Sequence, residues 1–177
     1  MTETAASPLA RSDLAHAAEF PLIASGVFQF QDASYDVQFI TESGLLDCLD
    51  YMTSRAAKPA TPSLYLSADG YEPSAPEWSP SNLRFDFDRE SGLGAAVLLV
   101  VDKHDDIHAW MTHGGQDRSD VHLAHDSWNP NARQFPPWAV VDLPHLREAI
   151  CQWAFGDVIP PPAVGWTPMP DEEIGWS

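Results

Sequence analysis

Apolar and polar residues alternate along Val27–Phe30 and again along Tyr35–Ile40. A period of two is typical of a strand with one buried face, and the polar stretch Asp32–Ser34 between the two runs favours a turn. The pattern therefore predicts a β-hairpin in the first quarter of the chain.

Directly after the hairpin the period changes to that of a helix. Thr41 suits the N-cap, Glu42 suits the first turn, and the basic residues near Arg55–Lys58 suit the C-terminal end before Pro59. The apolar residues in between share one helical face: Leu45, Leu46, Leu49 and Met52.

A second amphipathic helix is predicted further along. Asp142 suits its N-cap, and Pro144 lies in the first turn, where a missing N–H does no harm. Gly156 is expected to take the left-handed turn that ends the helix, and Pro160–Pro162 prevents its continuation. The apolar face of this helix carries Leu143, Leu146, Ala149, Ile150 and Trp153.

The sequence between the two helices predicts a meander of strands, with a long loop over residues 69–80. Asn82–Asp88 alternates, so we expect one of its faces to be exposed to solvent, whereas the apolar run Ala95–Val101 is expected to be a central strand buried on both faces. The other strands expected here are Ser63–Leu66, Ile107–Thr112 and Val121–His125, the last two separated by Gly114-Gly115.

This order of elements predicts an α+β fold, with a mainly antiparallel sheet and helices packed on one face. A length of 177 residues fits one hydrophobic core. Residues 1–18 are expected to form a mobile N-terminal arm, with room for a short helix around Ser12–Glu19, and residues 19–177 to form the single domain.

The C-terminal part of the chain has a distinctive order of residues: Phe135-Pro136, Ala149, Trp153, Phe155, Gly156, the prolines 160–162, Val164 and Trp166. In this order the chain resembles a bacterial immunity protein family, the one commonly associated with deaminase toxins of polymorphic toxin systems. The resemblance covers roughly residues 26–166 and implies an immunity-type domain that binds a toxin. Phe155-Gly156 stands where the family usually has Thr-Gly.

Charge narrows the range of partners. The chain has 26 acidic and 9 basic residues, for a formal net charge of −17. Direct binding to nucleic acid or to an anionic membrane is therefore disfavoured, and fast, salt-sensitive association with a basic protein is favoured. The same charge also aids solubility, so charge alone does not identify a partner.

The location expected from the sequence is cytoplasmic. No apolar run is long enough to span a membrane, and the N-terminus lacks the basic start and apolar core of a signal peptide. Cys48 and Cys151 both fall in predicted helices near apolar positions, so we expect two buried thiols in a reducing cytosol rather than a disulfide.

Histidines and aspartates crowd into residues 102–126. Imidazole and carboxylate groups together suit Zn²⁺, Fe or Mn, so a small metal-dependent enzyme is one alternative function. The spacing matches no known metal motif, and exposure on strands and turns is the favoured interpretation. The cluster comprises Asp102, His104, Asp105, Asp106, His108, His113, Asp117, Asp120, His122, His125 and Asp126.

No other group of residues predicts catalysis. An apolar setting is expected to raise the thiol pKa of Cys48 and Cys151, which makes both poor nucleophiles. Asp86 and Asp88 point the same way, but on what reads as an amphipathic edge strand. We therefore expect a protein that is not an enzyme and that carries no cofactor and no resident metal.

Two segments combine aromatic with acidic residues, as protein interfaces do. The expected toxin-binding residues are Asp69, Tyr71, Glu72, Glu77 and Trp78 in the first segment, and Asp117, Asp120, Asp126 and Trp128 in the second. The alternative for both tryptophans is that they cover the rim of the core.

Deaminases and nucleases act on polyanions and need basic clefts, so an acidic protein is suited to cover such a cleft. The expected function is an immunity protein that neutralises a cognate toxin in this way. The nucleic-acid deaminase class comes from the resemblance alone, and a nuclease toxin fits the charge equally well. An acidic DNA-mimic regulator is the remaining alternative.

Overall fold

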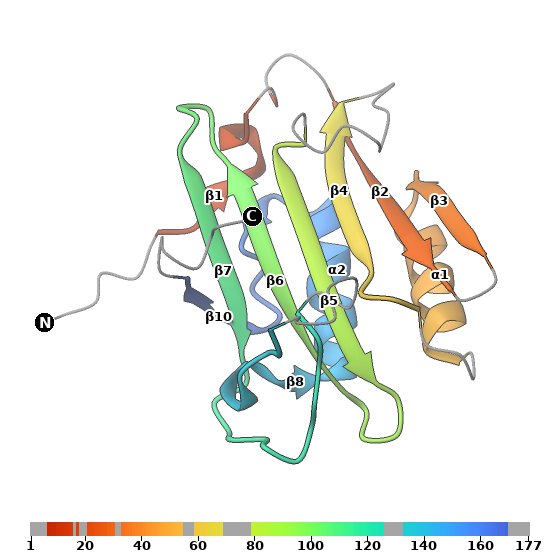
Figure 1. Ribbon diagram of the computed structural model, residues 1–177. Helices are drawn as coiled ribbons and strands as arrows, with labels where there is room; N and C mark the ends of the chain where they lie inside the picture. The colour runs from red at the N-terminus through yellow and green to blue at the C-terminus, as the bar shows by residue number, and fades with distance from the viewer. Residues whose placement is uncertain are drawn as a thin grey trace, which may run out of the picture.

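The computed structural model describes residues 7–15, 17, 21–30, 33–54, 59–68, 79–125 and 133–169. In this part of the chain a large antiparallel sheet has two α-helices on one face, which confirms the α+β prediction (Figure 1). The helical elements are α1 (Glu42–Ser54), α2 (Leu143–Phe155) and the 3₁₀ turns η1 (Arg11–Asp13) and η3 (Pro137–Ala139). The strands are β1 (Leu9–Ala10), β2 (Leu22–Gln29), β3 (Ser34–Phe39), β4 (Ser63–Ala68), β5 (Ser81–Asp88), β6 (Leu93–Val101), β7 (Ile107–His113), β8 (Val141–Asp142), β9 (Val158–Ile159) and β10 (Gly165–Pro168).

The main sheet has the strand order β10-β7-β6-β5-β4-β2-β3, with β8 added beside β6, and every pairing is antiparallel. The predicted hairpin is confirmed as β2–β3, with Val27 opposite Asp36. Strand β6 lies between β5 and β7 and is buried on both faces, as its continuous apolar sequence predicts. In the described residues neither helix is long and apolar enough to cross a lipid bilayer.

Two cores lie on opposite faces of the sheet. The helix-side core joins the sheet to α1 and α2, and its largest side chain, Trp153, is fully buried. The second core lies between β6 and β7 and the chain that follows β7, and it contains Met111, Val121, Leu123 and Phe135. The second core explains why β6 needs apolar residues at every position.

The prediction of a strand over Val121–His125 is wrong. Apart from one isolated bridge between Ala124 and Gln134, this stretch forms no strand, and Val121 and Leu123 instead pack into the second core. The reason is that the position beside β7 is taken by β10, which pairs along it from Gly165 opposite His113.

The prediction that one face of Asn82–Asp88 is exposed to solvent is also wrong at the centre of the strand, at Asp86. Strand β5 is an inner strand between β4 and β6, and Asp86 is only 2% exposed. Its Oδ2 accepts a hydrogen bond from Ala124 N at 2.6 Å, because the segment after β7 crosses this part of the sheet. Asp88 Oδ2 accepts a hydrogen bond from Ser91 N in the turn that follows β5.

The ends of the helices follow the predictions in part. Thr41 caps α1 as expected, accepting a hydrogen bond from Gly44 N at 3.2 Å. Asp142 occupies the N-cap of α2, but its side chain makes no capping hydrogen bond. Gly156 is extended (φ −89°, ψ 177°) rather than left-handed, and a Cβ there would lie 2.5 Å from Gln152 O, so close approach explains the glycine.

The described residues of the predicted arm are packed on the domain. Strand β1 pairs with β9, and Leu14 is buried in the helix-side core. Arg11 donates from Nη1 to Ala154 O at 2.7 Å and from Nη2 to Leu22 O at 2.9 Å, which satisfies the carbonyl end of α2. Where a short helix was expected around residues 12–19, the described residues form the 3₁₀ turn η1, and residues 16, 18 and 19 lie outside them.

Candidate binding surfaces

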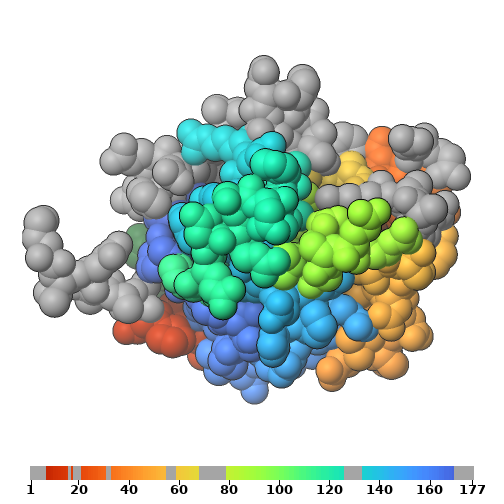
Figure 2. Space-filling model, turned by 90° about the horizontal axis from the view of Figure 1, so that it is seen from below, coloured from red at the N-terminus to blue at the C-terminus, as the bar shows by residue number. Residues whose placement is uncertain are grey.

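The structure describes two of the nine residues predicted to bind a toxin. Asp117 and Asp120 follow β7 and are both exposed. The other seven lie outside the described residues: Asp69, Tyr71, Glu72, Glu77, Trp78, Asp126 and Trp128. The segment that carries Asp117 and Asp120 stands out on the side of the molecule shown in Figure 2, next to the β5–β6 turn.

This segment lies along η3. Gly114 N donates to Trp138 O at 2.8 Å and Arg118 N donates to Pro137 O at 3.3 Å. Arg118 Nε lies 3.6 Å from Asp120 Oδ1, and the Asp120 side chain remains 71% exposed. The two backbone hydrogen bonds fix where the aspartates are presented.

Trp138 is the aromatic residue beside them, and it was missed in the sequence. Its side chain is 39% exposed, and its ring centroid lies 5.5 Å from that of His113, whose Nδ1 is 3.0 Å from Thr167 Oγ1. The two prolines before Trp138 begin the 3₁₀ turn η3, which exposes the indole. We call this set the β7–η3 surface: His113, Asp117, Arg118, Asp120 and Trp138.

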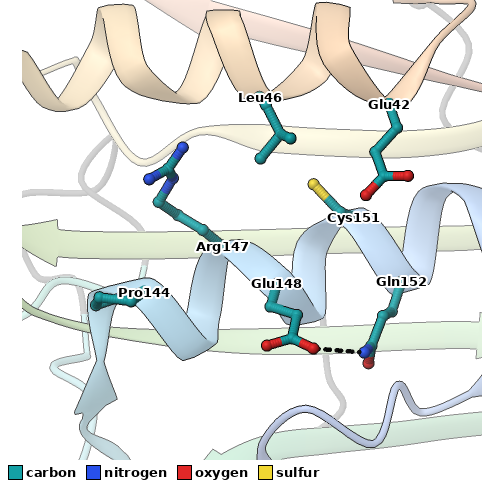
Figure 3. A pocket seen from close by; sticks show the side chains of 7 residues that line it. All are labelled: Glu42, Leu46, Pro144, Arg147, Glu148, Cys151 and Gln152. Atoms are coloured by element: carbon teal, nitrogen blue, oxygen red, sulfur yellow. Dashed lines mark hydrogen bonds between the residues drawn. The ribbon is translucent and has the colours of Figure 1, made fainter.

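A groove lies between α1 and α2, which run antiparallel on the helix side (Figure 3). Its volume is about 360 Å³. In Figure 3 Glu42 and Leu46 point from α1 towards α2, while Arg147 and Cys151 point from α2 towards α1. We call this the interhelical groove, and it is lined by Glu42, Leu46, Pro144, Arg147, Glu148, Cys151 and Gln152.

Exposed aromatic residues also lie where β3 meets α1. Tyr35 and Tyr51 are 42% and 48% exposed, and their rings pack edge-on against Phe30 at 5.8 and 6.4 Å. No sequence pattern singled out this pair, because a strand residue and a helix residue become neighbours only in the folded chain.

The His/Asp cluster is divided among separate places. His108 Nε2 lies 3.0 Å from Asp102 Oδ2 at the β6–β7 turn, whereas His113 lies at the far end of β7 and His122 Nδ1 is 3.2 Å from Gln134 Oε1. Among the described residues no group of three or more His, Cys, Asp or Glu side chains is placed to hold a metal ion. Asp126 lies outside those residues.

Asp102 organises the β6–β7 turn. Its carboxylate accepts from the His108 ring and from His104 N at 2.8 Å and Asp106 N at 3.1 Å. These hydrogen bonds lower the pKa of Asp102 to about 2, against an opposing effect of burial. The turn also receives the N-terminal segment, since Lys103 N donates to Asp13 O.

Replacing Asp102 with asparagine is expected to lower the stability at pH 7 by an amount that shrinks in acid. A lowered pKa means that the ionised carboxylate stabilises the fold fully above about pH 4, and that this contribution disappears as the pH falls through about 2. Urea unfolding of both proteins at pH 7 and pH 2.5 measures the difference. The neighbouring, exposed Asp105→Asn variant is the control, and an Asp102→Asn effect that is equal at both pH values would contradict the assignment.

Both cysteines are free thiols, Cys48 half-buried and Cys151 buried. Burial raises the pKa of each thiol to about 11, so both are protonated at neutral pH. This confirms the prediction that neither thiol is activated.

Comparison with models of known protein families gives no match for this chain, and comparison with curated protein sequences gives none either.

Proposed function

We propose that the protein is an immunity protein that binds and neutralises a cognate bacterial toxin domain. The observation that carries the proposal is the acidity of the surface. Of the carboxylates in the described residues, only Asp86 and Asp102 are buried, so the others are exposed or partly exposed to solvent. A surface of this charge attracts a basic protein and repels nucleic acid.

The 9 basic residues offset only part of the charge of the 26 acidic ones. Lys103, Arg118 and Arg147 form ion pairs with Asp13, Asp120 and Asp50. Arg11 and Arg89 donate to backbone carbonyls near the C-terminal ends of α2 and α1. The exposed carboxylates thus remain in excess, with Trp138 and the two exposed tyrosines as aromatic anchors of the kind found at interfaces.

The resemblance to the immunity family supports an immunity-type domain and the class of the toxin. Its residues Phe135, Ala149 and Trp153 are buried, and Trp166 Nε1 donates to Pro161 O at 2.7 Å, so they are residues that hold the domain together. A nucleic-acid deaminase is the toxin that the family association favours. Inhibition requires only that the acidic protein occupy or cover a basic active-site cleft.

The test is co-expression with the C-terminal domain encoded by the neighbouring gene, followed by affinity capture and a growth assay. A one-to-one complex that restores growth is expected. Absence of both binding and rescue contradicts the proposal. Displacement of DNA from several unrelated basic proteins also contradicts it, because a DNA mimic lacks the selectivity of an immunity protein.

Reversing the charge of Asp117 and Asp120 together, each to lysine, is expected to slow association with the toxin about tenfold at low ionic strength and to flatten its salt dependence. The reason is that both side chains are exposed at the β7–η3 surface, where they attract a basic cleft. Stopped-flow association rates across a salt series measure the effect. Reversal of Asp105 and Asp106 is the control with the same charge change, and equal rates for the two double variants would exclude this surface.

A further inference from the structure

The interhelical groove is shaped for one long side chain. At about 360 Å³ it lies at the small end of the range for ligand sites, roughly 300–1,000 Å³, and it is too small for a helix. Leu46 and Pro144 supply apolar walls, and Cys151 points towards α1 between Leu46 and Glu42. Such walls suit the methylene stem of a long polar side chain.

The two glutamates of the groove form no ion pair with any residue that the structure describes. The Glu42 carboxylate has no hydrogen bond or ion pair to any described residue. Among the same residues, Glu148 accepts only from the uncharged amide of Gln152, at 3.1 Å. Arg147 is the one basic side chain of the lining, and its Nη2 is held by Asp50 Oδ1 at 2.6 Å, away from both glutamates.

The two carboxylates act on the same point from different helices. Burial raises the pKa of the Cys151 thiol, and Glu42 on α1 raises it further. Arg147 lowers it, and Glu148 on α2 raises it by less than Arg147 lowers it. The negative potential at the floor of the groove therefore comes mainly from Glu42, with a smaller contribution from Glu148, and this potential attracts a cation.

We propose that this groove receives an arginine side chain of the protein partner, with the guanidinium between Glu42 and Glu148. This inference rests on the proposed function, since it names the chemistry by which the basic toxin is held. A guanidinium is planar, binds carboxylates through several N–H groups and is more weakly hydrated than an ammonium, so it suits a half-apolar site with two acidic walls better than lysine does.

The first test needs no toxin. The ¹⁵N-labelled protein is titrated with N-acetyl-arginine-N-methylamide, and with the citrulline analogue, in which an uncharged urea replaces the guanidinium. Amide shifts confined to Glu42, Leu46 and the α2 residues of the groove are expected for arginine, with at least tenfold weaker binding for citrulline. The Glu42→Gln/Glu148→Gln variant, checked for an unchanged folded spectrum, is expected to lose these shifts.

Three results would overturn the assignment. Shifts spread evenly over the acidic surface and unchanged in the double variant would show unspecific attraction. Equal affinity for N-acetyl-lysine-N-methylamide, which carries an ammonium in place of the guanidinium, would remove the preference for a guanidinium. Tighter binding of calcium chloride at the same residues would make the groove a metal site instead.

The second test uses the captured toxin. Glu42→Gln/Glu148→Gln is expected to weaken the complex at least tenfold, whereas Asp105→Asn/Asp106→Asn, which removes two charges elsewhere, is expected to change the affinity less than threefold. Equal effects of the two variants on a complex that does form would overturn the groove proposal and leave the proposed function standing. If no toxin complex is found although the arginine titration is positive, the proposed function is overturned and the groove remains a site for a guanidinium.

Discussion

Replacing Trp153 with alanine is expected to lower the free energy of unfolding by about 3–5 kcal/mol. Trp153 is the largest fully buried side chain among the described residues, and it joins α2 to the sheet. Its Nε1 donates to Ser81 Oγ at 2.9 Å, so the substitution leaves both a large cavity and a buried hydroxyl with one partner fewer. Urea unfolding followed by circular dichroism measures the loss.

Two variants separate the causes of this effect. Trp153→Phe keeps one buried aromatic ring and removes the N–H donor with the rest of the indole, so a smaller loss of about 1–2 kcal/mol is expected. Trp138→Ala removes the same kind of side chain from a site where it is 39% exposed, and the expected change is well under that of Trp153→Ala. If the two alanine variants lose similar stability, the helix-side core is not organised around Trp153.

Replacing Gly114 with alanine is expected to cost about 3 kcal/mol, at the upper end of the usual range for overpacking. A Cβ at this position would lie 1.7 Å from the backbone oxygen of Val140, which is far inside contact distance. The backbone must therefore shift, and the hydrogen bond from Gly114 N to Trp138 O must lengthen or break. Since Val140 belongs to the second core, the damage extends into that core.

The adjacent Gly115→Ala variant is the control for this result. Gly115 has φ +72° and open space around it, so only the left-handed backbone conformation opposes a side chain there, at a cost of about 1 kcal/mol. Thermal unfolding of both variants, with tryptophan fluorescence as a reporter of Trp138, compares them directly. A Gly115→Ala effect as large as that of Gly114→Ala would show that the turn conformation, and not contact with Val140, requires the glycines.

The elements predicted well are those whose signal is local. The β2–β3 hairpin, α1, α2 and the buried strand β6 each extend over six or more residues with a steady hydrophobic period, and each is found in its predicted place. The capping of α1 by Thr41 was equally visible, because a cap depends only on neighbouring residues.

The elements that were missed depend on distant partners. Strands β1, β8, β9 and β10 have two to four residues each, and β1 pairs with residues about 150 positions away, which no short window detects. The placement of β10 beside β7 is what turned the predicted strand at Val121 into a covering segment and buried Asp86.

The candidate site was predictable to a similar extent. Exposure of Asp117 and Asp120 followed from their polar surroundings. The exposed Trp138 required knowledge that two prolines begin a 3₁₀ turn, and the interhelical groove exists only because α1 and α2 lie side by side. The residues that line the groove come from two helices that are far apart in the sequence, so no short stretch of sequence contains both sets.

The pairing of β1 with β9, together with the bonds from Arg11 to the end of α2, sets the order of events during synthesis. A nascent chain emerges from the ribosome at roughly 5–20 residues per second, and β7 emerges with its outer edge still open. That edge is covered only when residues 165–168 arrive, and Leu14 gains its full surroundings only when residues 158 and 159 do. Strand β1 precedes every other described strand in the chain and is nevertheless among the last to be paired, so the described part of the domain closes only after β9 and β10 have been translated.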